Sequence, residues 1–326
     1  MDTFSILKTL TEIKSPSGKE EVLAKRLLEY LKSLGYDAFM EDLNLLLSPE
    51  RDFIVATHLD TFKFLVPFSF DGEYAYGTGV CDAKASIAAI LLALERIDRL
   101  NFGVAFFHNE EESGKGSEIF CKKYKPKRAV VMEPTNLTIA NVHYGGLEIK
   151  VKARGVAAHG ATPEKGENAI EKCIKTITDL KRIEDAIVSV QFLRGGNVED
   201  YVIPDSCEMR VEFSFKPNLR AERLLEEIEK TCQGNVEFAV KELHNGFVSG
   251  DIVKIIERAV MDAGLKARFS EMPSWSDAVH LHYLADCDAS SFGPGELHLC
   301  HTSRERVKLR DIELTAEVLI ALNRMI

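Results

Sequence analysis

The sequence predicts an α/β domain with a mainly parallel sheet sandwiched by helices, interrupted by an inserted α+β domain of ferredoxin-like order. Apolar runs of strand length alternate with helical patterns, and the runs end in polar clusters, which is typical of a parallel sheet. From Leu147 to Arg154 apolar and polar residues alternate strictly, which indicates a half-exposed antiparallel strand and a different kind of sheet. With 326 residues, the chain is long enough for two domains.

The first domain begins with a predicted helix over residues 17–35. Its apolar positions recur at helical spacing, Ser17 and Glu20 form a capping-box pattern, and Gly35 supplies the stop. The other elements expected before the insertion are strands 52–57, 102–108 and 128–132 and a buried helix over 83–97.

The inserted domain is expected over residues 143–246, leaving 1–142 and 247–326 for the first domain. Its order of elements is β-α-β-β-α-β, which is that of the ferredoxin-like split motif. The elements are strands 147–154, 186–193, 206–215 and 235–243 and helices 167–180 and 219–231. The chain then returns with helices 251–263 and 310–326 and strands near 268 and over 288–292.

Composition excludes several classes of function. A net charge of −10 disfavours nucleic-acid binding, because neutralising phosphates requires a basic face. Seven cysteines without a CxxC pair do not form a disulfide framework, which indicates reduced thiols and a cytoplasmic location. The beginning of the chain lacks a secretory pattern, and the longest near-apolar run, residues 64–70, is too short to span a membrane.

Three consecutive carboxylates, Glu110-Glu111-Glu112, follow the apolar run 101–108. Ionised carboxylates held together raise one another's proton affinity, so such a group usually surrounds a cation or a shared proton. In a parallel sheet, functional groups gather at the carboxyl ends of the strands. The polar residues expected at this edge are His58, Asp82, Glu111, Glu112 and Glu133.

These residue types fit a pair of divalent metal ions. Two metals about 3.5–4 Å apart need a bridging carboxylate, further ligands on each side and a nearby base. A late histidine would complete the set, and the candidates are His298 and His301.

Several motifs, taken in order, resemble those of the M20-type metallopeptidase and deacylase family, which includes acetylornithine deacetylase, succinyl-diaminopimelate desuccinylase, aminoacylase-1 and bacterial carboxypeptidase G2. The matching segments are His58-Leu59-Asp60-Thr61 for HxDT, residues 77–84 for GRGxxDxKG, residues 110–114 for DEExG, Glu133-Pro134-Thr135 for EPT and residues 158–170 for AHxAxPxxGxNAI. The resemblance covers nearly the whole chain.

The resemblance implies a role for each matching residue. Asp82 would bridge the metals, His58 and Glu133 would hold one, Glu112 and His301 would hold the other, Asp60 would orient His58, and Glu111 would be the general base. Glu110 stands at the family's Asp position and is expected to be a solvated neighbour. The inserted domain would be a lid and dimerisation domain, in which His159 stabilises the oxyanion, so a homodimer is implied.

The substrate is the least determined feature. Gly293-Pro294-Gly295 followed by His301-Thr302 and Glu305 resembles the ending of a subgroup that releases lysine or ornithine from an amino-group carrier protein, which favours His301 over His298. We therefore expect a zinc-dependent hydrolase, with cobalt or manganese as alternatives, acting on a small N-acylated or carrier-linked basic amino acid in lysine or arginine biosynthesis.

The alternatives are an acetylornithine deacetylase or succinyl-diaminopimelate desuccinylase, a di- or tripeptidase or carboxypeptidase, and a non-catalytic metal-binding protein of the same fold. Tyr201 and Ser214 depart from the family pattern near substrate-contacting positions. The basic run 122–128 is either a docking patch for an acidic carrier or a solvated connection.

Overall fold

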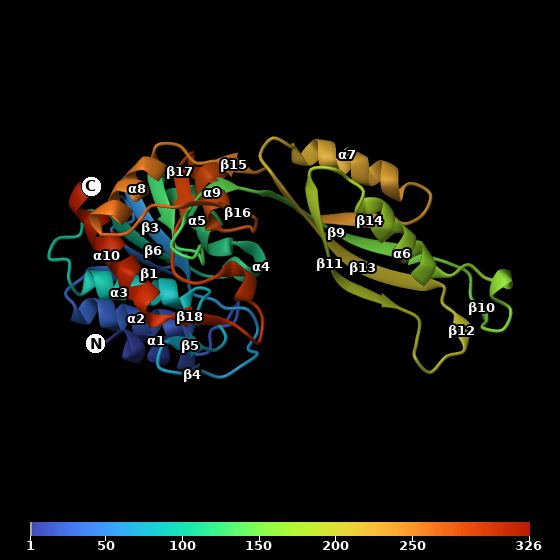
Figure 1. Cartoon of the computed structure of the whole chain (residues 1–326), viewed down its shortest axis with the longest axis horizontal. Coiled ribbons are helices and arrows are strands. Elements are labelled where there is room, and N and C mark those ends of the chain that lie inside the picture. Colours follow the sequence, from blue (N-terminus) through green and yellow to red (C-terminus); the bar gives the residue numbers. More distant parts are fainter. Residues whose placement is uncertain (1) are drawn as a thin grey trace. The chain divides into compact units, whose positions relative to one another are not determined.

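The structure is a computed structural model that describes residues 2–326. Its elements are labelled in Figure 1. The helices are α1 (Thr3–Glu12), α2 (Glu21–Ser33), α3 (Lys84–Leu94), α4 (Glu110–Ser113), α5 (Lys115–Lys123), α6 (Ala169–Leu180), α7 (Ala221–Cys232), α8 (Ile252–Asp262), α9 (Asp277–Ala285) and α10 (Leu309–Met325). Among the described residues, no helix is both long enough and apolar enough to cross a bilayer.

The longest strands lie in the middle of the sequence. They are β1 (Ala38–Glu41), β2 (Asn44–Leu47), β3 (Phe53–His58), β4 (Ser69–Phe70), β5 (Tyr74–Tyr76), β6 (Gly103–Phe107), β7 (Arg128–Val131), β8 (Ile139–His143), β9 (Gly145–Arg154), β10 (Ala158–His159), β11 (Ala186–Gly195), β12 (Val202–Ile203), β13 (Ser206–Phe215), β14 (Glu237–His244), β15 (Phe247–Val248), β16 (Phe269–Met272), β17 (Asp288–Ser291) and β18 (Arg306–Lys308).

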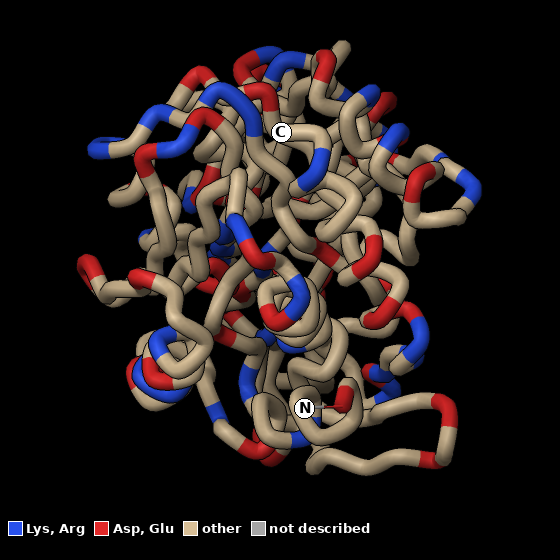
Figure 2. Tube along the Cα trace, turned by 90° about the vertical axis from the view of Figure 1, so that its left-hand side faces the viewer, with Lys and Arg blue, Asp and Glu red and all other residues tan. Residues whose placement is uncertain are grey.

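Charged residues of both signs are interspersed along the chain, and Figure 2 shows no large area of one sign in the face it presents. A few charged side chains are buried instead of exposed. Such side chains are informative, because a buried charge is costly unless it is paired or bound to a metal. The charged side chains that lie buried are Glu20, Asp60, Asp82, Lys84, Glu133, Asp277 and Glu305.

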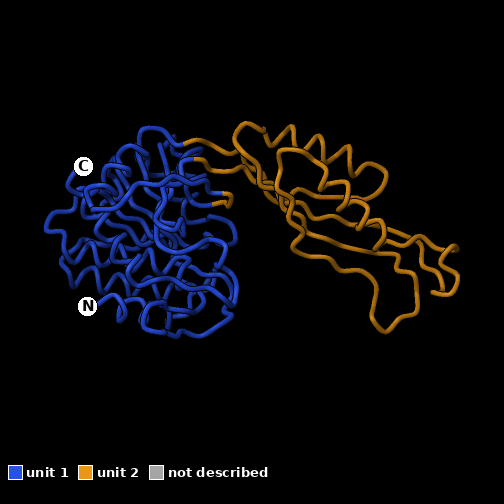
Figure 3. The backbone as a smooth tube through the Cα atoms, in the orientation of Figure 1, with its two compact units in different colours: residues 1–141, 249–272, 276–326 blue, residues 142–248, 273–275 orange. Residues whose placement is uncertain are grey.

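The chain forms two compact units (Figure 3). The first runs up to residue 141 and continues over 249–272 and 276–326, and the second comprises 142–248 with 273–275. The second unit is therefore an insertion, from which the chain returns to the first.

A mixed sheet forms the centre of the first unit. Its strands run in the order β1-β2-β6-β3-β7-β17-β8-β15, and β16 pairs with β8 off this path. β6, β3, β7 and β17 are parallel, whereas β1, β2 and β8 add antiparallel strands at the sides. This confirms the mainly parallel sheet predicted from the sequence, and it brings the carboxyl ends of β3, β6 and β7 to the same edge.

Helices cover both faces of this sheet, because neighbouring residues of a strand point to opposite sides. Phe106 belongs to the core shared with α1, α2, α3, α8 and α10, and the next residue, Phe107, packs edge-on against Phe120 of α5 at 5.2 Å between ring centroids. In α3, every residue except Leu92 is buried, as expected for a helix whose apolar residues leave no polar face.

The second unit contains a four-stranded antiparallel sheet in the order β11-β13-β9-β14. With α6 after β9 and α7 after β13, this is the ferredoxin-like arrangement expected from the sequence. Leu147, Ile149 and Val151 of β9 are buried against the core with α6 and α7, whereas Lys150 between them is exposed. A small ladder of β10 and β12 carries His159.

The beginning of the chain differs from the prediction. α1 was not predicted, and α2 begins at Glu21 without the expected capping box. Ser17 instead donates its hydroxyl to Asp60 Oδ2 at 2.7 Å, and the carboxylate of Glu20 accepts from the backbone N–H groups of Gly18 and Asn109. Both side chains therefore serve long-range contacts rather than the helix end.

Candidate metal centre

Ends of three parallel strands and two loops supply the site. His58 is the last residue of β3, the glutamates follow β6, and Glu133 follows β7. Asp82 lies in the turn before α3, and His301 lies in the turn before β18.

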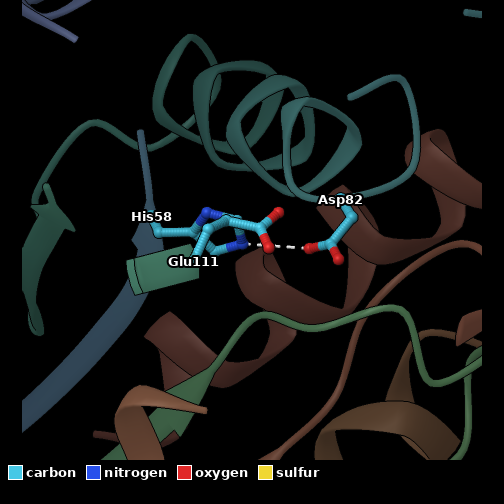
Figure 4. A group of neighbouring side chains, drawn as sticks. All are labelled: His58, Asp82 and Glu111. Atoms are coloured by element: carbon cyan, nitrogen blue, oxygen red, sulfur yellow. Dashed lines mark hydrogen bonds and ion pairs between the residues drawn. The ribbon is translucent and has the colours of Figure 1, made fainter. Parts of the chain in front are cut away.

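His58 and Asp82 are the buried residues at the bottom of the site (Figure 4). His58 Nε2 lies 2.9 Å from Asp82 Oδ1, and His58 Nδ1 lies 2.9 Å from the carbonyl oxygen of Asp60. That second contact fixes the ring, so Nε2 is the nitrogen that faces the other site residues. The carboxylate of Asp60 lies on the same side of the ring, with Oδ1 at 3.5 Å from His58 Nδ1.

Asp60 also holds the glutamate turn. Its Oδ1 accepts from the N–H of Glu110 at 3.0 Å, and its Oδ2 accepts from the N–H of Glu111 at 3.1 Å. Burial would raise the pKa of Asp60, but hydrogen bonds with His58, Ser17 and Glu110 hold that pKa below its usual value. Asp60 is therefore an anion that orders both His58 and the residues after β6.

Asp82 faces a histidine with each carboxylate oxygen. Oδ1 meets His58, and Oδ2 lies 3.4 Å from His301 Nε2. Burial opposes ionisation of Asp82, yet the two histidines keep its pKa below the usual value. An anionic carboxylate with one oxygen toward each of two groups is the geometry of a bridging ligand.

Glu111 lies beside the second histidine. Its Oε1 is 2.9 Å from His301 Nε2 and accepts from the N–H of Phe62 at 3.0 Å. The Phe62 ring stacks on the His301 ring with centroids 4.8 Å apart. Potential ligand atoms of His58, Asp82 and Glu111 all lie within 4.8 Å of one another, as Figure 4 illustrates.

Glu112 does not join this group. It is exposed, and its carboxylate approaches the Asn109 amide nitrogen at 3.5 Å. Glu110 is not the solvated neighbour expected from the sequence. The residue is partly exposed, but burial of its carboxyl group raises its pKa well above the usual value, an effect that nearby His58 opposes and Glu133 reinforces.

Most of this chain matches a known protein family. The model of the Peptidase family M20/M25/M40 matches residues 54–324. The chain belongs to this family. It is accordingly a metal-dependent hydrolase of amide or peptide bonds.

M20-family relatives match almost end to end. A putative [LysW]-lysine/[LysW]-ornithine hydrolase of Pyrobaculum aerophilum is 25% identical, covering 98% of this chain and 96% of the relative. A succinyl-diaminopimelate desuccinylase of Corynebacterium glutamicum is 26% identical, covering 98% and 95%. The crystal structure of an M20 family metallo-carboxypeptidase from Sulfolobus solfataricus has a TM-score of 0.82 at 15% identity, covering 99% of both chains, which shows the shared fold.

The residues of this M20-family chain fit a pair of metal ions. Glu133 is 5% exposed, and among residues 2–326 its Oε1 has no hydrogen-bond partner. Burial, together with the charges of Asp82, Asp277 and Glu111, raises the pKa of Glu133 well above its usual value despite His58. A cation would satisfy this oxygen and offset the repulsion between the carboxylates.

Two further residues of the sequence analysis have contacts of their own. His298 is exposed and lies 3.8 Å from Glu296. His159 belongs to the second unit, is exposed, and accepts from the N–H of Ala161 at 3.1 Å through Nδ1. Sequence reasoning overlooked Phe62, although its place directly after the HxDT segment was a usable signal.

Proposed function

We propose that this M20-family hydrolase cleaves the amide bond of an N-acylated or carrier-linked basic amino acid and releases lysine or ornithine. The observation that carries the hydrolytic part is Asp82, whose two oxygens face His58 and His301 at 2.9 and 3.4 Å. The basic product is supported by the names of two relatives, the putative [LysW]-lysine/[LysW]-ornithine hydrolase of Pyrobaculum and the succinyl-diaminopimelate desuccinylase of Corynebacterium.

The proposed ligands follow the contacts. His58 and Glu133 would hold one metal, His301 and Glu111 would hold the other, and Asp82 would be the ligand shared by both. This moves two roles by one residue relative to the motif, which assigned the second metal to Glu112 and the general base to Glu111. The side chain of Glu111 is 7% exposed and contacts His301, whereas Glu112 is exposed.

The backbone explains why the roles move by one residue. Asn109 adopts a left-handed conformation with φ 56°, and α4 starts directly after it. The N–H groups of Glu110 and Glu111 both bind Asp60, so these two residues are fixed at the site. The next residue of a helix is rotated by about 100°, which turns Glu112 toward solvent.

Glu110 is then the proposed general base. When bound, two divalent cations supply an acidified water and polarise the substrate carbonyl. Glu110 would take a proton from the attacking water as the water oxygen bonds to the amide carbonyl carbon, and it would return that proton to the amine nitrogen as the C–N bond breaks. Asp60 keeps Glu110 and His58 in place throughout. Phe62 holds the ring of His301 by stacking.

Further parts of the proposal come from the resemblance. They are zinc as the resident metal, with cobalt or manganese able to replace it, His159 as the oxyanion donor, a homodimer, a cytoplasmic location and a place in lysine or arginine biosynthesis. A non-catalytic metal-binding protein is disfavoured, because such a protein has no need of an additional buried carboxylate beside its ligands.

The basic run 122–128 gives little support to carrier docking. Lys122 pairs with Glu118, Lys123 with Glu41 and Lys127 with Asp52. Their charges are thus largely neutralised by neighbours of the same chain.

A substrate panel tests the proposal. It contains acetylornithine, succinyl-diaminopimelate, simple dipeptides and a carrier protein with lysine attached to its terminal glutamate. We expect turnover of the carrier-linked lysine or of an acylated basic amino acid. Cleavage of dipeptides alone would refute the proposed substrate class and favour a peptidase.

A further inference from the structure

Glu305 lies four residues after His301, and its carboxylate is buried against the loop that carries Asp82. The residue is 2% exposed. Its Oε2 accepts from the N–H of Gly79 at 3.0 Å, and its Oε1 accepts from the N–H groups of Cys81 at 3.0 Å and Asp82 at 3.2 Å. One carboxylate therefore binds most of the short loop that ends in Asp82.

The two loops also pack closely through smaller groups. The Sγ atoms of Cys81 and Cys300 lie 3.3 Å apart, directly before Asp82 and His301 in sequence. A Cβ on Gly295 would lie 2.2 Å from Cys81 Sγ, so this approach requires glycine. Close packing leaves little freedom for the loops to adjust if the carboxylate of Glu305 is changed.

Lys84 is a buried basic residue whose pKa responds to the charge of Glu305. The Lys84 ammonium group donates to the carbonyl oxygen of Ile13 at 2.6 Å. Burial lowers the pKa of Lys84 to about 8, and the charge of Glu305 opposes that shift. Burial raises the pKa of Glu305 to about 7, against the hydrogen bonds from the N–H groups of Gly79, Cys81 and Asp82. In the ionised form those three bonds are charge-assisted and stronger than bonds to a neutral acceptor.

We propose that Glu305 is a positioning residue for the metal centre, which fixes the 79–82 backbone so that Asp82 presents one oxygen to the His58 side and the other to the His301 side. The inference rests on the proposed two-metal function. Glu305 contacts none of the proposed metal-binding side-chain atoms, and it acts through the backbone of Asp82. A bridging ligand must hold both oxygens within about 0.5 Å of the productive positions, so a small shift of this backbone affects both metals.

The test compares Glu305→Gln with the matched control Glu296→Gln. The first substitution keeps the size of the side chain but places an NH2 group against backbone N–H donors. Glu296 lies on the same segment, and its carboxylate lies 3.8 Å from the exposed residue His298. Each chelator-treated full-length chain is titrated with Co²⁺, and binding is followed by calorimetry and by visible absorption of the bound ion.

We expect Glu305→Gln to bind Co²⁺ about 10–100-fold more weakly, with a changed visible spectrum, because removing a partner of a metal ligand has effects of that size. We expect Glu296→Gln to match the wild type. The thermal midpoint of each metal-free chain is measured in parallel, and a role limited to folding would lower that midpoint in Glu305→Gln without changing the spectrum of the bound ion.

Wild-type affinity and a wild-type spectrum in Glu305→Gln would overturn the inference. If this variant does not fold, Glu305→Asp is titrated in its place; it keeps the charge but shortens the reach, and wild-type behaviour there would overturn the inference equally. A wild-type chain that binds no Co²⁺ would refute both the proposed function and this inference. Normal binding by the wild type and by the Glu305 variants would refute this inference alone.

Discussion

Replacing each consecutive glutamate by glutamine separates their roles. Glu110→Gln removes the proposed base and retains every proposed ligand. General-base catalysis contributes about 10²–10⁴ in rate, so we expect kcat to fall by that factor while two metals stay bound. Glu112→Gln changes an exposed side chain and should leave both quantities within about twofold of the wild type, because surface substitutions usually have effects below about 0.5 kcal/mol.

Glu111→Gln should behave differently from both. The Oε1 atom of Glu111 lies 2.9 Å from His301 Nε2, and the substitution removes the negative charge of this carboxylate. Two unit charges 4 Å apart interact by about 4 kcal/mol at an effective dielectric constant of about 20. We therefore expect the second metal to bind about 10³-fold more weakly in this variant.

The assay combines metal analysis after dialysis with steady-state kinetics on the best substrate of the panel. Full metal content with lost turnover in Glu111→Gln, together with loss of one metal in Glu112→Gln, would refute the shifted assignment and restore the roles expected from the motif.

Three further predictions follow from the same contacts. Phe62→Leu removes the ring that stacks on His301, so kcat/KM should fall up to about tenfold with little change in thermal midpoint, and unchanged kinetics would show that the stacking has no role. Glu133→Gln should reduce the metal content after dialysis from two ions to one per chain, since it removes an anionic ligand; two retained ions would exclude Glu133 from the centre. In the metal-free chain, hydrogen bonds with Asp82 and Glu111 raise the pKa of His301 to about 10 against the effect of burial. A raised pKa gives stability that is complete below about pH 6.5 and is lost as pH rises toward 10. The thermal midpoint in chelator should therefore fall across that window, and the fall should be smaller in His301→Asn. An equal fall in both chains would contradict this.

The sequence predicts the helices and strands correctly where the spacing of apolar residues matches the face that is buried. Strands β3, β6 and β7 are nearly continuous apolar runs, and the buried helix α3 and the alternating strand β9 follow their expected periods. The polar ends of those strands placed His58 and Glu133 correctly at one edge of the sheet. α1 was also detectable, because Ile6, Leu7 and Leu10 form an apolar face behind the N-terminal cap Asp2.

The choice among the three glutamates could not be made in the same way. All three residues are identical, so shifting the motif by one position leaves the residue types unchanged. The deciding features are the left-handed backbone at Asn109 and the bonds from Asp60 to the N–H groups of Glu110 and Glu111, which join residues about fifty positions apart. Long-range contacts of this kind also explain why Ser17 binds Asp60 instead of capping α2.

Metal stoichiometry tests the central claim most directly. The wild-type chain, purified without chelators and analysed by elemental spectrometry, should contain two divalent transition-metal ions per chain. Glu112→Gln should contain the same number, and Glu111→Gln should contain one. A wild-type chain without stoichiometric metal would contradict the two-metal centre formed around Asp82.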